Sequence, residues 1–170
     1  MPKDMSLEDM RAMRPGRSAE LERLDMLAGD WTTEGTVEFI TAREPIHTTG
    51  ENHSAWECDG RFLVERASFD MGALGPMTGI SIWTWDAGAR RYRMWWFDSF
   101  GESASGTARF DDRAMTWHIK TRGQNGFCRV RSRGTIRQID CDTLEWTWRQ
   151  NAFMGLFKIA DMKGVSRRKR

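Results

Sequence analysis

The first 29 residues have the apolar spacing of helices. Three leucines recur at every third position and form one stripe: Leu21, Leu24 and Leu27. Ser18 is well placed to cap this helix. An earlier stretch, residues 6–14, is predicted as a second helix that ends before Pro15. An apolar stripe needs a surface to cover, so we expect the segment to pack against the domain that follows.

From residue 30 onward, apolar and polar positions alternate with the two-residue period of β-strands. Turn sequences such as Asp59-Gly60 separate ten such runs, and no helix-length segment lies between them. Consecutive strands therefore pair antiparallel, and a sheet of this size removes its edges by closing. The predicted strands are 31–41, 46–58, 61–71, 77–85, 92–99, 103–110, 114–122, 127–139, 143–150 and 153–162.

This pattern predicts an all-β fold: a closed antiparallel up-and-down barrel of about ten strands, with the N-terminal helical segment plugging one end. We divide the chain into a helical segment at residues 1–29, a barrel at residues 30–165 and a basic, disordered tail at residues 166–170. A chain of 170 residues fits one such domain.

The alternation also assigns faces. Leu144, Trp146 and Trp148 share one face of their strand and are predicted to point into the barrel. On residues 127–137 the arginines Arg129, Arg131, Arg133 and Arg137 fall on the opposite face, so we expect a solvated basic stripe outside. Residues 80–85 and 94–97 are apolar on both faces, which predicts an outer cover by the helices or by a second subunit. We therefore expect a homodimer.

Tryptophan is the unusual component of the composition, with nine Trp against one Tyr. Inward-facing indoles either fill the interior of a barrel or line a cavity within it. We favour a cavity that binds a small apolar or aromatic molecule. The candidate ligand-binding residues are Trp31, Trp83, Trp85, Met94, Trp96, Asp98, Trp117, Trp146 and Trp148.

Asp98 shares the face of Trp96, so it points inward if Trp96 does. A carboxylate there is a weak candidate for a catalytic acid or base, or it orients a ligand. The alternative is that Asp98 ends its strand and bonds the turn at Gly101. Glu65 and Arg66 point to opposite faces of another strand, so one of the two enters the barrel.

Other functions find little support in the sequence. His47 and His53 share a face but lie about 20 Å apart on an extended strand, so we expect no metal site. The net charge is only +2, and the aromatic residues share strands with acidic residues, so we expect no nucleic acid as a partner. No apolar run approaches the about 18 residues of a membrane span, and three unpaired cysteines are typical of a cytoplasmic protein.

Several motifs resemble those of lipocalin-like (calycin) barrels. They are Leu24-x-x-Leu27-x-Gly29-x-Trp31-x-x-x-Gly35, Gly60-Arg61-Phe62-Leu63-Val64, Trp83-Thr84-Trp85-Asp86 and Tyr92-x-x-x-Trp96-x-Asp98-Ser99. Within that group they resemble a bacterial family catalogued as domain of unknown function fifteen-seventy-nine, over about residues 20–160. The resemblance implies a barrel that binds a small ligand. More distant resemblances are to nitrobindin and to fatty-acid-binding barrels.

The nitrobindin family binds haem through a histidine near its C-terminus. This chain has no histidine after His118, and Thr33 replaces one glycine of that family's opening motif. We therefore expect no haem and no other cofactor.

The resulting hypothesis is a ligand-binding protein with an internal, Trp-rich cavity. One alternative is an enzyme, such as an isomerase, cyclase or hydrolase, that uses Asp98 or another enclosed acid or base. A second alternative is a non-catalytic scaffold whose filled barrel serves subunit or partner contacts.

Overall fold

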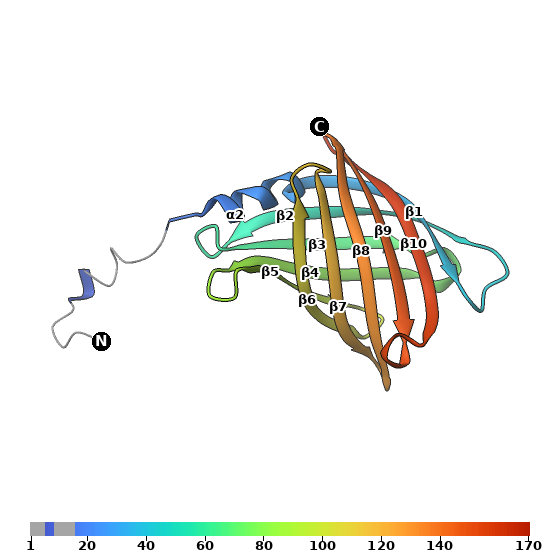
Figure 1. The fold of residues 1–170 in the computed structure, drawn as a ribbon. Helices are drawn as coiled ribbons and strands as arrows, with labels where there is room; N and C mark the ends of the chain where they lie inside the picture. The colour runs from blue at the N-terminus through green and yellow to red at the C-terminus, as the bar shows by residue number, and fades with distance from the viewer. Residues whose placement is uncertain (1–5, 9–15) are drawn as a thin grey trace.

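The computed structural model describes residues 6–8 and 16–170. Within that part of the chain, ten antiparallel strands form one closed barrel, and a short helical segment precedes them (Figure 1). Most of the helix predicted over residues 6–14 lies outside the described residues. None of the helices described is long and apolar enough to cross a membrane.

The strands follow one another around the barrel in sequence order, and β1 also pairs with β10 to close it. This confirms the predicted up-and-down topology. The strands are β1 (Gly29–Phe39), β2 (Ile46–Glu57), β3 (Phe62–Asp70), β4 (Pro76–Asp86), β5 (Arg91–Asp98), β6 (Glu102–Asp111), β7 (Thr116–Asn125), β8 (Cys128–Asp140), β9 (Thr143–Ala152) and β10 (Phe157–Arg168).

The helical segment consists of α2 (Ala19–Glu22) and the 3₁₀ helix η1 (Arg23–Leu27), and it closes the end of the barrel where β1 begins (Figure 1). The hydroxyl of Ser18 accepts a hydrogen bond from the Leu21 amide and caps α2, as the sequence predicts. Leu21, Leu24 and Leu27 are all buried against the barrel interior. The predicted plug is therefore confirmed.

Aromatic side chains of the strands hold this plug in place. The Tyr92 hydroxyl donates to the carbonyl of Glu20 at 2.9 Å, and the Trp31 indole N–H donates to the carbonyl of Leu27 at 3.1 Å. Trp117 has no exposed surface and packs edge-to-face against Tyr92. These contacts satisfy the polar tips of large apolar groups, so the closed end is a filled core.

The barrel extends further toward the C-terminus than the pattern predicts. β10 continues to Arg168, and Ser166, which we expected in a disordered tail, is a buried inward residue of that strand. The Arg168 guanidinium lies over the Trp31 ring and donates to the carbonyl of Ala28. The basic residues looked like a solvated terminus because their pairing with β1 and the plug is not visible locally.

The outer face agrees with the predicted alternation. Arg129, Arg131 and Arg133 of β8 are exposed on the outside of the barrel. Ile80 of β4 and Phe97 of β5 face each other across their strand pair and are also exposed. The described helical segment does not cover these two side chains, so a second subunit over them stays a prediction.

Candidate functional site: a cavity inside the barrel

A cavity of about 320 Å³ lies inside the barrel, between the helical segment and the loops at the opposite end. Its lining runs from Leu27 and Trp31 beside the plug to Phe100 and Asn125 beside the far loops. We call this far end the open end. Ligand sites in proteins run from about 300 to 1,000 Å³, so the space suits one small molecule.

The structure separates the nine predicted site residues into two groups. Seven of them line the cavity: Trp31, Trp83, Met94, Trp96, Asp98, Trp146 and Trp148. Trp85 and Trp117 instead pack around Tyr92 in the plug core. The two alternatives posed by the sequence therefore both occur, because indoles fill the closed end and line a hollow beyond it.

Glycines on the inner face let the indole rings lie flat against the wall. A Cβ atom on Gly134 would lie 2.5 Å from the ring of Trp148, and one on Gly79 would lie 2.5 Å from the ring of Trp96. Such distances leave no room for any other residue at these positions while the rings stay in place. The glycines therefore keep the rings out of the central space.

Glu65 of β3 is the carboxylate that enters the barrel, while Arg66 points outward and pairs with Glu57. The Asn52 side-chain amide donates to one Glu65 oxygen at 2.6 Å, and the Ser81 hydroxyl donates to the other at 2.6 Å. All three side chains belong to neighbouring strands and line the cavity. Register pairing thus places two neutral donors on one acid.

This polar cluster extends along the inner wall. The Trp83 indole N–H donates to the Ser81 hydroxyl at 2.9 Å, and the Thr33 hydroxyl bonds that of Ser166 at 2.7 Å. A longer contact of 3.4 Å links Thr33 to Asn52. Satisfied networks of this kind hold polar side chains in fixed orientations.

Enclosure in the barrel raises the pKa of Glu65 above its ordinary value, and the hydrogen bonds from Ser81 and Asn52 oppose that shift. Each carboxylate oxygen accepts one bond within the described residues, although a carboxylate has about four lone-pair sites. Because the side chain also borders the cavity, the unused acceptor capacity faces a space that a ligand can enter.

A second polar group lies on the cavity wall at the open end. The Gln150 side-chain amide donates to Glu102 at 2.6 Å. Partial burial raises the pKa of Glu102. The hydrogen bond from Gln150 opposes this rise, and the nearby Asp98 carboxylate adds to it. The cavity therefore has an acidic group at each of two levels, one deep and one near the mouth.

Both carboxylate oxygens of Asp98 accept hydrogen bonds within the protein, so Asp98 is less able to bind a ligand or transfer a proton than the sequence suggests. One of its oxygens accepts the backbone amides of Phe100 and Glu102 at 3.0 Å each, so it closes the β5–β6 turn. The other oxygen accepts the Trp96 indole N–H at 2.9 Å. The role in its own turn, posed as an alternative, is thus what the structure shows, although the side chain also borders the cavity.

The histidines lie away from the cavity. All three belong to the described residues, and none is among the lining residues. His53 is exposed and bonds Asp30 at 2.7 Å on the outer face. In the part of the chain that the structure describes, no three His, Cys, Asp or Glu side chains gather as a metal site.

The sequence identified most of the indole lining but missed the polar wall. Leu63 and Phe69 share the inward face of Glu65, and this was the available signal that Glu65 enters the barrel. Val64 on the other face is also apolar, so the alternation alone left the choice between Glu65 and Arg66 open. The bonds to Asn52 and Ser81 depend on strand register, which the pattern does not fix.

Solved structures of other proteins share this fold, among them the following two. Rv2717c from M. tuberculosis matches with a TM-score of 0.70 at 18% sequence identity, covering 90% of this chain and 99% of that chain. The S-type phycobiliprotein lyase CPES from Guillardia theta matches with a TM-score of 0.57 at 11% identity, covering 91% and 95%. At these identities the likeness establishes the fold alone.

A family model described as a protein of unknown function (DUF1579) matches residues 17–166. That range includes the helical segment and almost the whole barrel. The comparison with curated proteins gives no match.

Proposed function

The chain belongs to the DUF1579 family, whose description names no function, and we propose that it binds one small, largely apolar molecule that carries a hydrogen-bond donor. The observation that carries this proposal is the position of Glu65. Its carboxyl group borders an indole-lined cavity of about 320 Å³ and retains unused acceptor capacity toward it.

Apolar contact supplies the affinity in this proposal. Trp96, Trp146 and Trp148 are only half-buried in the protein alone, since they border the cavity. A ligand that covers them removes apolar surface from water, at about 25 cal/mol per Å². The donor on the ligand then meets Glu65, which fixes its orientation.

A hydroxyl, amine or ring N–H group fits this acceptor. An uncharged donor can form a hydrogen bond to Glu65 whether the carboxyl group is protonated or ionised. A protonated amine would form an ion pair with the ionised carboxylate. Haem is not part of the proposal, because no histidine lines the cavity. The fold shared with the phycobiliprotein lyase is compatible with this proposal, but the proposal does not depend on it.

The experiment that tests the proposal is recovery of the occupant from the expression host. Freshly purified protein is denatured in organic solvent, and the released molecules are identified by mass spectrometry. The matched control is Trp148→Ala with Trp146→Ala, which removes two indoles of the wall. A molecule recovered from the wild type and lost from the control supports the proposal. The same small molecules from both proteins would contradict it.

A second candidate function is acid–base catalysis at Glu65. A carboxyl group with a raised pKa inside a cavity is typical of general acids and bases. Glu65 meets this description better than Asp98, whose oxygens are occupied by its turn and by Trp96. This alternative predicts that the Glu65→Gln variant holds the unreacted substrate, whereas the wild type converts that substrate to product. Recovery of two different, chemically related molecules from the two proteins would favour the enzyme.

A further inference from the structure

Large apolar side chains are exposed in every loop at the open end of the barrel. Within the described residues, five loops join strands there, and each carries at least one such side chain. We call this set the apolar rim: Ile40 (β1–β2), Leu74 (β3–β4), Phe100 (β5–β6), Phe127 (β7–β8), and Phe153, Leu156 and Phe157 (β9–β10 and the start of β10).

The rim is unusually exposed. The Phe127 side chain is as accessible as in an isolated residue, at 106%, and Leu156 is 78% exposed. Phe153 and Phe157 contact each other edge-to-face, so they form one surface. At the closed end, the described strand-joining loops and adjoining strand ends carry two exposed large apolar residues, Met115 and Ile139. Exposed apolar side chains that gather at one end of a protein indicate an interaction site, whereas the same residues scattered singly over the surface would not.

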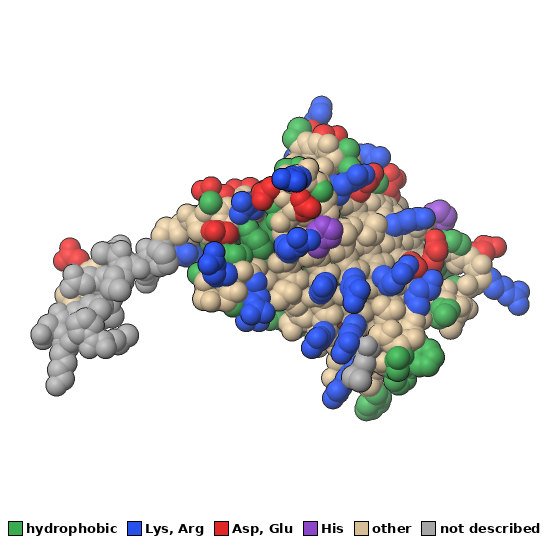
Figure 2. All heavy atoms as spheres, in the orientation of Figure 1, with side chains coloured by type: hydrophobic (Ala, Val, Ile, Leu, Met, Phe, Trp, Pro, Cys, Tyr) green, Lys and Arg blue, Asp and Glu red, His purple; other side chains and the backbone are tan. Residues whose placement is uncertain are grey.

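A strongly basic surface adjoins the rim. We call it the basic face: six exposed cations on the outside of β6, β7 and β8, namely Arg109, Lys120, Arg122, Arg129, Arg131 and Arg133. In the described part of the chain none of them forms an ion pair. Figure 2 shows Lys and Arg side chains along this side of the barrel, next to apolar side chains at the lower right end.

Like charges face each other directly on the basic face. Lys120 pairs in register with Arg133, and Arg122 pairs with Arg131. Cross-strand pairs of equal charge destabilise a sheet. Their presence without acidic partners indicates a surface adapted to an anionic partner.

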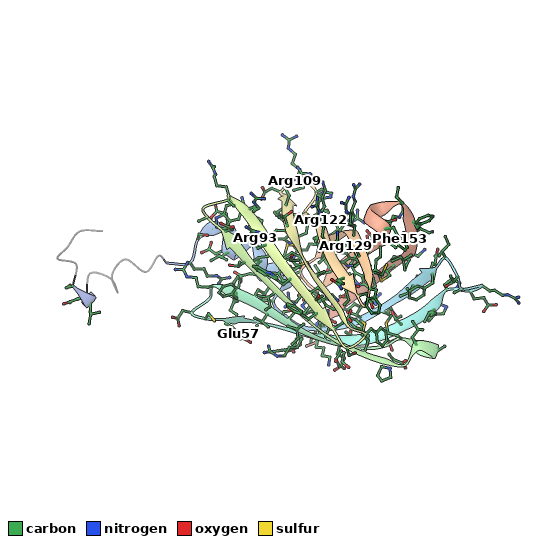
Figure 3. All side chains as sticks on the ribbon, turned by 90° about the horizontal axis from the view of Figure 1, so that it is seen from below. Glu57, Arg93, Arg109, Arg122, Arg129 and Phe153 are labelled. Carbon is green, nitrogen blue, oxygen red and sulfur yellow. The ribbon has the colours of Figure 1, made fainter. Side chains whose placement is uncertain are left out.

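The rim and the basic face meet at the β7–β8 turn. At about 3.3 Å per residue, Arg129 lies about 7 Å along the chain from Phe127, and Arg131 about 13 Å. These spacings are comparable to the Debye length of about 8–10 Å at physiological salt. In Figure 3, Arg109, Arg122 and Arg129 follow one another across β6, β7 and β8, and Phe153 lies beyond them.

Within the described residues, the acidic side chains at the open end do not pair with the cations of the basic face. At the open end, Asp70 and Asp98 accept hydrogen bonds from backbone amides of their own turns, and Glu102 bonds Gln150. Asp161 is paired with Arg149 and Lys158. Glu44 in the β1–β2 loop stands beside Arg43 in the chain.

We propose that the open end of the barrel docks on an anionic lipid bilayer. The apolar rim enters the interface between headgroups and acyl chains, and Arg129, Arg131 and Arg122 lie over the lipid phosphates. Exposed apolar residues combined with basic residues are the physical requirement for reversible binding to such a surface.

Other occupants fit these observations less well. A second copy docked rim to rim would bring two basic faces together, and they would repel each other. A nucleic acid needs aromatic side chains within the basic surface for base stacking, but here the exposed aromatic residues lie outside the basic face, at the loop tips and, for Phe97, on β5. The β6 partners of Arg122 and Lys120 within the face are small and polar, namely Ser105 and Thr107.

Docking goes beyond the proposed function and does not depend on the identity of the cavity's occupant. If both hold, the mouth of the cavity faces the bilayer, and an apolar molecule moves between the two without crossing water. Vesicle binding and ligand binding have separate readouts, so either proposal can fail alone.

The experiment is co-flotation of the full chain with vesicles of phosphatidylcholine alone or mixed with phosphatidylserine, at low and high salt. We expect binding to the mixed vesicles only, and less at high salt. Arg129→Gln with Arg131→Gln lowers the partition coefficient by about 25-fold. Phe127→Ser with Leu156→Ser lowers it by about tenfold or more.

Matched controls come from the closed end. Met115→Ser and Arg113→Gln remove an exposed apolar residue and an exposed cation there, and we expect wild-type binding from both. Circular dichroism of every variant verifies the fold. Failure of the wild type to float with anionic vesicles would overturn the proposal. So would equal binding by the rim variant, or preferential binding of single-stranded nucleic acid that the rim variant leaves unchanged.

Discussion

Ser81 lies directly across from Glu65 on the neighbouring strand, and its hydroxyl donates a 2.6 Å hydrogen bond to the Glu65 carboxylate. The same hydroxyl accepts the indole N–H of Trp83 at 2.9 Å. Ser81 therefore connects the enclosed acid to the aromatic floor of the cavity, and the pair depends on β3–β4 register rather than on any local motif.

Replacing this serine tests the connection. Ser81→Ala removes a donor from Glu65 and leaves the Trp83 N–H without its acceptor, so we expect the free energy of unfolding to fall by about 1–3 kcal/mol. Urea denaturation measures the change. Ser132→Ala is the matched control, because Ser132 is also a buried cavity residue but does not bond Glu65. Equal losses in the two variants would show that the connection has no energetic importance.

The raised pKa of Glu65 gives stability a specific pH dependence. Above the ordinary value of 4.5 the unfolded chain releases this proton while the folded chain retains it, so stability falls as the pH rises toward the folded pKa. Within that window the contribution changes by about 1.4 kcal/mol per pH unit. Glu65→Gln does not titrate, so its stability relative to the wild type should increase as the pH rises above 4.5.

Denaturation at a series of pH values measures this difference, with Glu44→Gln in the exposed β1–β2 loop as the control. A stability difference between Glu65→Gln and the wild type that stays constant with pH would mean that the carboxyl group titrates normally in the folded protein.

The glycine wall predicts a loss of cavity space on substitution. Gly134→Ala forces the Trp148 ring toward the centre, because a Cβ would lie 2.5 Å from it. We expect about 1–3 kcal/mol of destabilisation and about tenfold or more loss of affinity for a small aromatic probe. Gly16→Ala is the control, since a Cβ there meets no atom within 4 Å. Unchanged probe affinity in Gly134→Ala would place the binding space elsewhere.

The plug should contribute to the stability of the whole barrel. Leu24 has no exposed surface and packs among the aromatic residues of the closed end, so Leu24→Ala is expected to cost about 2–5 kcal/mol. Leu7→Ala changes a residue that is 83% exposed and should cost almost nothing. Chemical denaturation followed by tryptophan fluorescence compares the two. A small effect of Leu24→Ala would mean that the barrel folds without its plug.

Much of the fold could be predicted from the sequence because it depends on local alternation. Trp146 and Trp148 are separated by one polar residue, so both rings share a face, and the polar residues of the opposite face leave the indole face inside. Ser18 and the leucine stripe likewise predicted the plug from spacing. In both cases the residues whose spacing supports the prediction lie within one strand or within one short helical segment.

The parts that could not be predicted depend on contacts between distant segments. An inward indole can pack against the plug, like Trp117, or line the cavity, like Trp148. Which of the two occurs depends on the position of the residue along the barrel axis, and the stagger between neighbouring strands determines that position. The Glu65 site needs Asn52 and Ser81 from two other strands. Arg168 joins the barrel through Trp31 and Ala28, more than a hundred residues earlier, and through Cys141 and Asp142 in the β8–β9 turn.

The most direct test of the account is calorimetric titration with two aromatic probes of matched shape, 1-naphthol and 1-methoxynaphthalene, which differ in their hydrogen-bond donor. We predict that the wild type binds both and prefers the naphthol by about tenfold, and that Glu65→Met abolishes the preference while it still binds both. Absence of binding by either probe, or an unchanged preference in Glu65→Met, would contradict the claim that the barrel holds an apolar molecule oriented by Glu65.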